Sequence, residues 1–385
     1  MKINGILLMI VFLLARADMM TADESTIDGK LGQVEQMING NDSDGAMKLL
    51  KKMIKSQPDD WKLHSLLGNL YMLKGDNASA AKCYNDALNL APAEPDIYNN
   101  LGLLEMQRGN GEAAINNFLL TINLMPGHSS ANYNVGKIYY AQNKPAEAEK
   151  YFTKVLAENP FHVLSLYHMA HIRQAEGKVD EAKVFYKKAI AADPLFDEAK
   201  MDFGTMLVSA GRLDEAVSFF KSVSGKTSDP GLSLLGLALI SKAQGNKEEA
   251  LGFLQEAAKA SPKNHKYLVE QTVLYLDIGG KDAFARGEKC LKSAAKLAGK
   301  DGQPVYMLAA LYDDNNIPEK AIDYYDEAID LNYNVGKAKI FKAMALIKIG
   351  KNRDAEKVLN DVLKTMPQGG PYCLKAQELL KSISK

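Results

Sequence analysis

Four histidines stand close together in the sequence, and imidazoles in such a group could bind a metal ion. His128, His162, His168 and His171 fall within 44 residues, and the last two lie three positions apart on one face of a helix. Zinc sites, however, use three or four ligands. No cysteine or carboxylate stands at a companion spacing, and no second histidine pair completes the set. The sequence therefore predicts no metal site.

Motifs of enzyme active sites are also missing. The sequence contains no glycine-rich loop of the kind that holds a phosphate, and no nucleophile-elbow pattern. The pair Gly279-Gly280 stands at a turn between two helices, which explains it without a ligand. We therefore expect neither an enzyme nor a bound cofactor.

The sequence contains a repeat of 34 residues, and this repeat defines the structural units that would position any functional side chain. Alanine recurs at this interval from Ala46 to Ala250, and aromatic residues and prolines keep the same interval. A fixed period of this length is typical of stacked helical repeats. The interval predicts units at 27–60, 61–94, 95–128, 129–162, 163–196, 197–230 and 231–264, an irregular unit at about 265–301, units at 302–335 and 336–369, and a capping helix at 370–385.

Each unit is predicted to contain two amphipathic helices joined by a tight turn. In residues 61–94, Gly75 ends the first helix, because glycine accepts the left-handed backbone of a helix cap. Pro92 ends the second helix, since proline lacks an amide donor. Gly68 and Ala80 are small, which predicts a close approach of the two backbones. The residues of this unit that define the pattern are Leu67, Gly68, Tyr71, Ala80, Tyr84, Ala87 and Pro92.

This pattern resembles the tetratricopeptide repeat over residues 27–369. The resemblance implies an all-α fold, a right-handed superhelical solenoid of about ten helix-turn-helix repeats, in which the first helices line a concave groove. Ser228 departs from the pattern because it replaces the terminating proline. We therefore expect a joint at residues 224–230, between an N-terminal block, 27–230, and a C-terminal block, 231–369.

The groove that the resemblance implies is the candidate binding site for a partner. Asn100 and Asn134 occupy equivalent positions in adjacent units, with Asn69 nearby, and a row of amides can hold an extended peptide backbone. Alternatively, these asparagines are only soluble residues on an exposed face. The groove tyrosines either receive apolar side chains of a partner or pack against neighbouring helices. The candidate residues are Asn69, Asn99, Asn100, Tyr133, Asn134, Lys137, Tyr140, Tyr167, His168 and His171.

The beginning of the sequence is typical of a secretory signal peptide. Met1-Lys2 precedes an apolar run from Ile6 to Ala15, and a small-residue cleavage site ends at Ala17. The run is too short to span a bilayer as a helix. We expect residues 1–17 to be removed, with a linker at 18–26, and the mature chain to be periplasmic or extracellular. An uncleaved anchor is the alternative.

The charge balance argues against nucleic-acid binding, and the cysteine positions argue against disulfide bonds. The chain has 47 acidic and 47 basic residues, which is unlike the basic surplus of proteins that bind nucleic acids. Cys83, Cys290 and Cys373 fall in different repeats, too far apart to pair in a stack where each repeat touches only its neighbours. We interpret all three as buried small apolar residues.

These features favour a non-enzymatic protein–protein interaction scaffold that binds extended or helical partner segments in its groove. The expected export favours a role in assembling an envelope or secretion-related complex. Two alternatives stay open. The chain could be an envelope component that binds a polysaccharide or another polymer, with tyrosines stacked on sugars. It could also be a subunit that recruits substrates to an enzyme on a separate chain.

Overall fold

A computed structural model of the chain describes residues 27–383, and over this range every regular element is an α-helix. The predicted signal peptide, 1–17, and the predicted linker, 18–26, lie outside the described residues. Within the described part, no helix is both long and apolar enough to cross a membrane. The prediction of an all-α repeat fold is confirmed.

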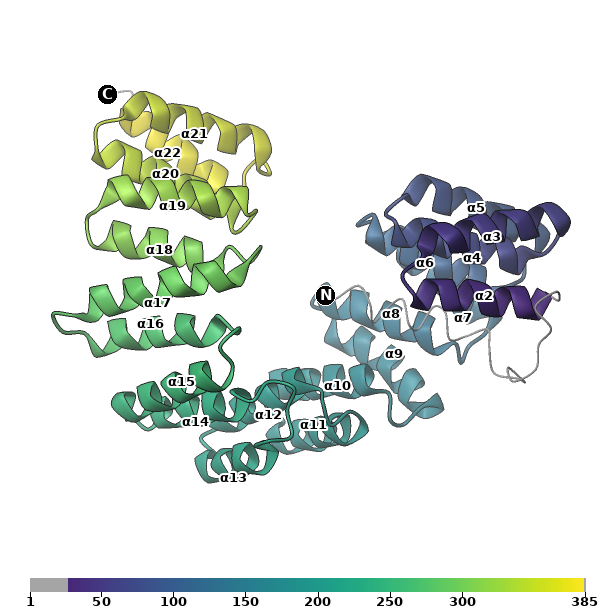
Figure 1. Cartoon of the computed structure of the whole chain (residues 1–385), viewed down its shortest axis with the longest axis horizontal. Coiled ribbons are helices and arrows are strands. Elements are labelled where there is room, and N and C mark those ends of the chain that lie inside the picture. The colour runs from purple at the N-terminus through teal and green to yellow at the C-terminus, as the bar shows by residue number, and fades with distance from the viewer. Residues whose placement is uncertain (1–26, 384–385) are drawn as a thin grey trace. The chain divides into compact units, whose positions relative to one another are not determined.

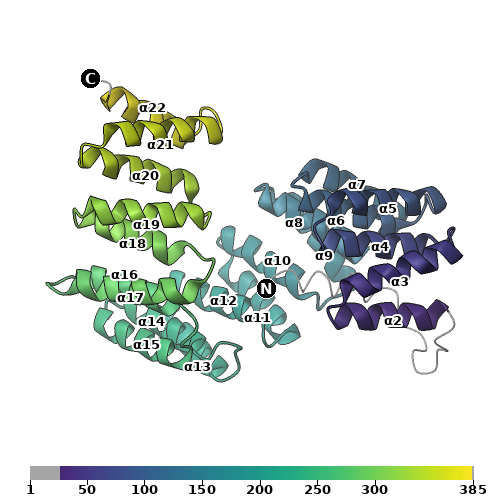
Figure 2. The same cartoon turned by 45° about the horizontal axis from the view of Figure 1, so that its top comes forward.

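The chain divides into two compact units, Met1–Ala192 and Asp193–Lys385, which we call unit 1 and unit 2. The joint expected at residues 224–230 lies inside unit 2. Each unit is a series of helix pairs in which a first helix packs against a second. Figure 1 shows the helices of each unit in chain order, and Figure 2 shows them from a second direction.

Unit 1 contains five helix pairs within the described residues, and their bounds follow the predicted repeats. The pairs are α2 (Ile27–Asn39) with α3 (Ser43–Ser56), α4 (Trp61–Leu73) with α5 (Asn77–Leu90), α6 (Pro95–Gln107) with α7 (Gly111–Leu124), α8 (Ser129–Ala141) with α9 (Pro145–Glu158), and α10 (Val163–Ala175) with α11 (Val179–Ala192). The predicted helix-turn-helix units are therefore confirmed here.

Unit 2 continues the same pattern and ends in a single helix. Its pairs are α12 (Asp197–Ser209) with α13 (Leu213–Val223), α14 (Leu232–Ala243) with α15 (Lys247–Ala260), α16 (Lys266–Ile278) with α17 (Ala283–Ala298), α18 (Gln303–Asp314) with α19 (Pro318–Asp330), and α20 (Val335–Lys348) with α21 (Asn352–Thr365), followed by α22 (Pro371–Ile383). Cys373 and Ala376 of α22 are buried, so this helix covers the last pair.

Glycines on the first helices make room for aromatic rings of the second helices. A Cβ atom added to Gly68 would lie 2.6 Å from Cε1 of Tyr84. The same contact joins Gly136 to Phe152, where the distance would be 2.8 Å. Gly68 is therefore small because it accommodates the ring of Tyr84. Tyr84 is fully buried and belongs to one core cluster with Ile97 and Leu104 of the next pair.

The turns inside the pairs need a left-handed backbone conformation. Gly75 adopts it between α4 and α5, with φ of 78°. Asn143 takes the equivalent place between α8 and α9, with φ of 59°. Asparagine tolerates this region better than other residues that carry a side chain, so the repeat keeps its turn without the glycine.

The three cysteines are unpaired thiols in the described part of the chain. Cys83 and Cys373 are buried, as predicted, whereas Cys290 is only half-buried. Sγ of Cys290 lies 3.8 Å from Oε1 of Gln271, a residue on the neighbouring helix of the same pair. The prediction of buried small residues is therefore confirmed for two of them.

The recurring alanines can be tested by overpacking one of them. Ala148 on α9 is fully buried, so Ala148→Leu should lower the free energy of unfolding by about 1–3 kcal/mol. Chemical denaturation followed by circular dichroism measures this change. Ala146→Leu is the matched control, because Ala146 is exposed on the same helix and surface substitutions change stability by about 0.5 kcal/mol or less. Equal stability of both variants would contradict the packing described here.

Candidate functional site

The residues predicted to line the groove all lie on first helices of unit 1. The structure places Asn69 on α4, Asn99 and Asn100 on α6, four residues on α8 and three on α10. They form two groups, one of amides and one of aromatic and basic side chains. The members on α8 are Tyr133, Asn134, Lys137 and Tyr140, and those on α10 are Tyr167, His168 and His171.

The amide side chains are mostly engaged inside the protein. Nδ2 of Asn100 donates a hydrogen bond to Oγ of Ser65 at 3.1 Å, which links α6 to α4. Oδ1 of Asn69 accepts one from the Tyr84 hydroxyl at 2.6 Å. Asn100 and Asn134 are each only 8% exposed. A row of asparagines that holds a peptide therefore stays a prediction, and it would have to use the remaining hydrogen-bonding groups of these amides.

Asn99 and Asn134 differ in how well their polar groups are satisfied. Nδ2 of Asn134 donates to Oγ of Ser130 at 3.3 Å within α8. Oδ1 of Asn99 is buried on α6 without a hydrogen-bond partner among the described residues. A buried polar atom without a partner is unusual in folded proteins. The carbonyl oxygen of Asn99 therefore lacks the hydrogen bond that a buried amide usually makes.

The aromatic and basic residues gather into one cluster, which we call the α8–α10 face. It consists of Tyr133, Lys137 and Tyr140 on α8, and Tyr167, His168 and His171 on α10. The ring centre of His168 lies 5.2 Å from that of Tyr140 and 5.8 Å from that of Tyr167. Tyr167 and His171 meet edge to face at 4.5 Å. All of these rings are half-buried, so part of each ring faces solvent.

Two rings from the second helices lie beneath this face. Phe152 on α9 is fully buried and stacks on His168, with ring centres 5.1 Å apart and planes 7° from parallel. Tyr186 on α11 is also fully buried and lies 6.2 Å from Tyr167. Sequence reasoning missed the contribution of both rings to the face, although their periodicity marked them as core residues.

His168 is neutral at pH 7 in this environment. Burial lowers the pKa of His168 to about 4, and the positive charges of His171, Lys137 and His162 lower it further in the same direction. Nε2 of His168 lies 3.3 Å from the hydroxyl of Tyr133. Its Nδ1 is buried and has no hydrogen-bond partner among the described residues. His168 is therefore an uncharged ring at the centre of the face, with one hydrogen-bonding group that the described residues do not satisfy.

The other two histidines of the predicted group cap helices. Nδ1 of His128 accepts the amide hydrogen of Ala131 at the start of α8, and Nδ1 of His162 accepts that of Ser165 at the start of α10, both at 3.2 Å. This role requires an unprotonated Nδ1, and burial lowers the pKa of His162. In the described part of the chain, no group of three or more His, Cys, Asp or Glu side chains is placed to hold a metal ion.

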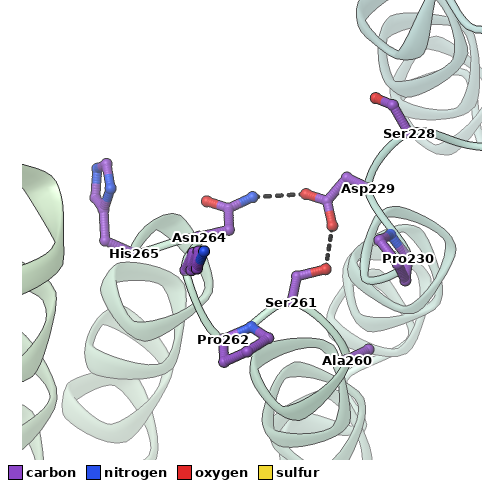
Figure 3. Close-up of a pocket in the computed structure, with 9 residues that line it drawn as sticks. Ser228, Asp229, Pro230, Ala260, Ser261, Pro262, Asn264 and His265 are labelled. Carbon is purple, nitrogen blue, oxygen red and sulfur yellow. Dashed lines mark hydrogen bonds between the residues drawn. The ribbon is translucent and has the colours of Figure 1, made fainter.

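Unit 2 contains an open pocket of about 610 Å³. It lies between the loop that joins α13 to α14 and the loop that joins α15 to α16, and Figure 3 shows Asp229 at its centre with hydrogen bonds to Ser261 and Asn264. The pocket is lined by Ser228, Asp229, Pro230, Ala260, Ser261, Pro262, Lys263, Asn264 and His265.

The carboxylate of Asp229 is satisfied by this chain. Oδ1 accepts the amide hydrogen of Gly231 at 3.0 Å and the hydroxyl of Ser261. Oδ2 accepts Nδ2 of Asn264 and the hydroxyl of Tyr267, both at 2.6 Å. Burial raises the pKa of Asp229, but the hydrogen bonds outweigh it and the pKa is lowered. We interpret the carboxylate as a structural anchor between loops, because its hydrogen-bonding capacity is used.

A second carboxylate holds the loop that lacks the terminating proline. Oδ2 of Asp197 accepts hydrogen bonds from the amide and hydroxyl of Ser228, at 2.8 and 2.5 Å, and from the amide of Asp229 at 3.1 Å. Lys200 is 1% exposed and donates to Oδ1 of Asp197 at 3.1 Å. The polar network thus replaces the proline at this position, and sequence reasoning did not foresee it.

Comparison with known protein families agrees with this geometry. A family model described as TPR repeat matches residues 68–107, and models described as tetratricopeptide repeat match residues 129–162, 173–231, 232–264 and 303–335. These matches fall in both units. The chain is a tetratricopeptide repeat protein. No curated protein matches this tetratricopeptide repeat chain.

Solved structures with similar repeats are distant in sequence. A tetratricopeptide repeat protein from Parabacteroides merdae is 21% identical, with 60% of this chain and 92% of that chain covered and a TM-score of 0.44. PilW, a type IV pilus biogenesis factor, is 20% identical, with 60% and 92% covered and a TM-score of 0.42. YrrB, a TPR protein with an unusual peptide-binding site, is 22% identical, with 48% and 95% covered and a TM-score of 0.39.

The neutral state of His168 predicts a pH dependence of stability. The pKa of His168 is about 4 in the folded chain against an ordinary value of 6.5, so the unfolded chain binds more protons between these pH values. Stability should therefore be complete above about pH 6.5 and fall by roughly 1–3 kcal/mol as the pH approaches about 4. Urea denaturation followed by fluorescence of Trp61, the single tryptophan, measures unit 1.

Two variants separate titration of His168 from packing. His168→Phe keeps a ring but cannot bind a proton, so it should flatten the pH dependence. Ala148→Leu lowers stability through packing and should keep the slope of the original chain. If His168→Phe retains that slope as well, the buried neutral imidazole is not its source.

The anchor in unit 2 predicts a local loss of stability in Asp229→Asn. The amide keeps the shape of the carboxylate but accepts fewer hydrogen bonds, which should cost about 1–3 kcal/mol. Hydrogen exchange of the full chain should become faster in the loops around residues 224–231 and 261–265. Asp214→Asn is the control, because Asp214 is exposed on α13. Unchanged exchange in Asp229→Asn would show that the loops are held by other contacts.

Proposed function

We propose that this tetratricopeptide repeat chain is a non-enzymatic protein-interaction scaffold, and that its α8–α10 face binds an extended or helical segment of a partner protein. The observation that carries the proposal is the layer of half-buried aromatic rings on α8 and α10, supported from below by Phe152 and Tyr186. Rings held by a buried floor lose little freedom on binding, and tyrosine is enriched at the energetic centres of protein interfaces.

Tyr133 and Tyr140 pack against the buried cluster around Phe152, but the repeat does not need a ring at the position of Tyr133 in every unit. Tyr133 and Tyr167 occupy equivalent positions in successive units, and the residues at the same position in the two preceding units are Asn99 and Ser65. The same fold therefore forms with a small polar residue at this place. The rings that the fold does need, such as Phe152, are fully buried on the second helices. This difference favours a binding role for the rings of α8 and α10.

The proposal also includes a more specific role, in which the chain takes part in assembling an envelope or secretion-related complex. Its support is the sequence of residues 1–17, with a charged start, a short apolar run and a small-residue cleavage site. Residues 1–17 lie outside the described part of the chain. Cell fractionation of the native host tests this part separately, since a chain found only in the cytoplasm would contradict it.

Substitution of two half-buried rings of this face tests the proposed binding. The full chain with a C-terminal affinity tag is expressed in its native host, crosslinked and purified, and its partners are identified by mass spectrometry. Tyr140→Ala/Tyr167→Ala should lose at least one partner that crosslinks to unit 1, with a loss of about tenfold or more, because interface tyrosines often contribute 2 kcal/mol or more each.

A matched double variant controls for loss of tyrosine itself. Tyr98 on α6 and Tyr151 on α9 are also half-buried but lie outside the α8–α10 face, so Tyr98→Ala/Tyr151→Ala should keep the partner. Melting temperatures of both variants show that they are folded. Equal capture by the two double variants would contradict binding at this face. Loss of polysaccharide retention in Tyr140→Ala/Tyr167→Ala, with protein capture unchanged, would instead favour the polymer-binding alternative.

A further inference from the structure

The permanently charged residues of α8 and α10 are all basic. Neither helix contains an aspartate or a glutamate, and their permanently charged residues are Lys137 and Arg173. The histidine at the centre of the face, His168, is neutral at pH 7 because burial lowers its pKa to about 4. The charge of the α8–α10 face therefore depends on how these two cations are compensated.

Arg173 is compensated inside the protein. Its guanidinium group forms ion pairs with Glu149, with Glu176 at 3.0 Å and with Glu181 at 3.0 Å. Hydrogen bonding to Glu149 is the main cause that raises the pKa of Arg173. Because three carboxylates surround Arg173, its charge is already neutralised within the protein.

Lys137 is in the opposite situation. It is exposed on α8, four residues after Tyr133 and three before Tyr140, so it lies on the same side of the helix as both rings. Its ammonium group is close enough to His168 to lower the pKa of that imidazole. Among the described residues, no carboxylate forms an ion pair with Lys137. It is the uncompensated charge of the face.

A partner that covers the rings also removes Lys137 from water. Desolvating an ammonium group without an anion is strongly unfavourable, whereas desolvating a paired one costs much less. Neither α8 nor α10 offers a carboxylate for this purpose, and imidazole side chains carry no negative charge. Because no carboxylate of the described residues pairs with Lys137, a carboxylate of the partner is the counter-ion that the face can take.

We propose that the segment bound at the α8–α10 face carries an aspartate or glutamate side chain that pairs with Lys137, beside aromatic or apolar side chains that cover the rings of Tyr140, Tyr167 and His168. This inference rests on the proposed function, and it names the chemical class of the partner. An internal acidic side chain is meant, as opposed to a chain terminus.

Peptide selection on the full chain tests this chemistry. Random linear peptides displayed without a free C-terminus are selected on the unmodified chain, on Lys137→Gln and on Lys137→Glu, and the selected pools are sequenced. The unmodified chain should enrich aspartate or glutamate next to aromatic or proline residues. Lys137→Gln should keep the aromatic enrichment and lose the acidic one, and Lys137→Glu should enrich lysine or arginine instead.

A synthetic peptide measures the strength of the pair. Replacing the acidic residue of a selected peptide by its amide should weaken binding to the unmodified chain about tenfold or more, as for close charge pairs at interfaces. The same replacement should leave binding to Lys137→Gln nearly unchanged. Lys150→Gln is the matched control, because Lys150 is exposed on the second helix α9, and it should select the same peptides as the unmodified chain.

The outcomes separate this inference from the proposed function. Acidic enrichment that persists in Lys137→Gln, or aromatic enrichment without acidic residues on the unmodified chain, would overturn the inference and leave protein binding at the face intact. Failure to enrich any peptide on any of the variants, all with normal melting temperatures, would contradict both the inference and the proposed function.

Discussion

The contact between an aromatic ring and a glycine inside three successive helix pairs is the constraint on which the rest of unit 1 depends. Tyr84 against Gly68, Phe118 against Gly102 and Phe152 against Gly136 bring the two helices of a pair together at one fixed place. Because each ring is fully buried, the contact leaves little freedom in how the helices cross. Repeating it at a constant interval presents the first helices side by side in one orientation.

The candidate site is built on this same contact. Phe152 packs against Gly136 on one side and stacks on His168 at 5.1 Å on another, so a single buried ring sets both the pair and the floor of the α8–α10 face. The imidazoles of His128 and His162 begin the two helices that carry the face. Packing, helix capping and the chemistry of the surface are therefore coupled through a few side chains.

The sequence predicted the helices and their pairing closely because glycine, proline and alanine act through local backbone and packing rules that recur with the period. It could not show that Asp197 replaces a missing proline or that Asp229 anchors two loops in unit 2, since those hydrogen bonds join residues more than 30 positions apart. A usable signal was overlooked at His128 and His162, which stand one repeat apart directly before first helices. The ring cluster depends on distances between helices, which composition and period do not give.

The central claim, that the α8–α10 face of this repeat protein binds a partner segment, is tested most directly by hydroxyl-radical footprinting of the full chain with and without a captured partner or selected peptide. The account predicts that binding slows oxidation of Tyr140, Tyr167 and His171 while Tyr151 on the second helix α9 reacts as before. Unchanged oxidation of the first three residues, with protection of Tyr151 or of unit 2 instead, would contradict it.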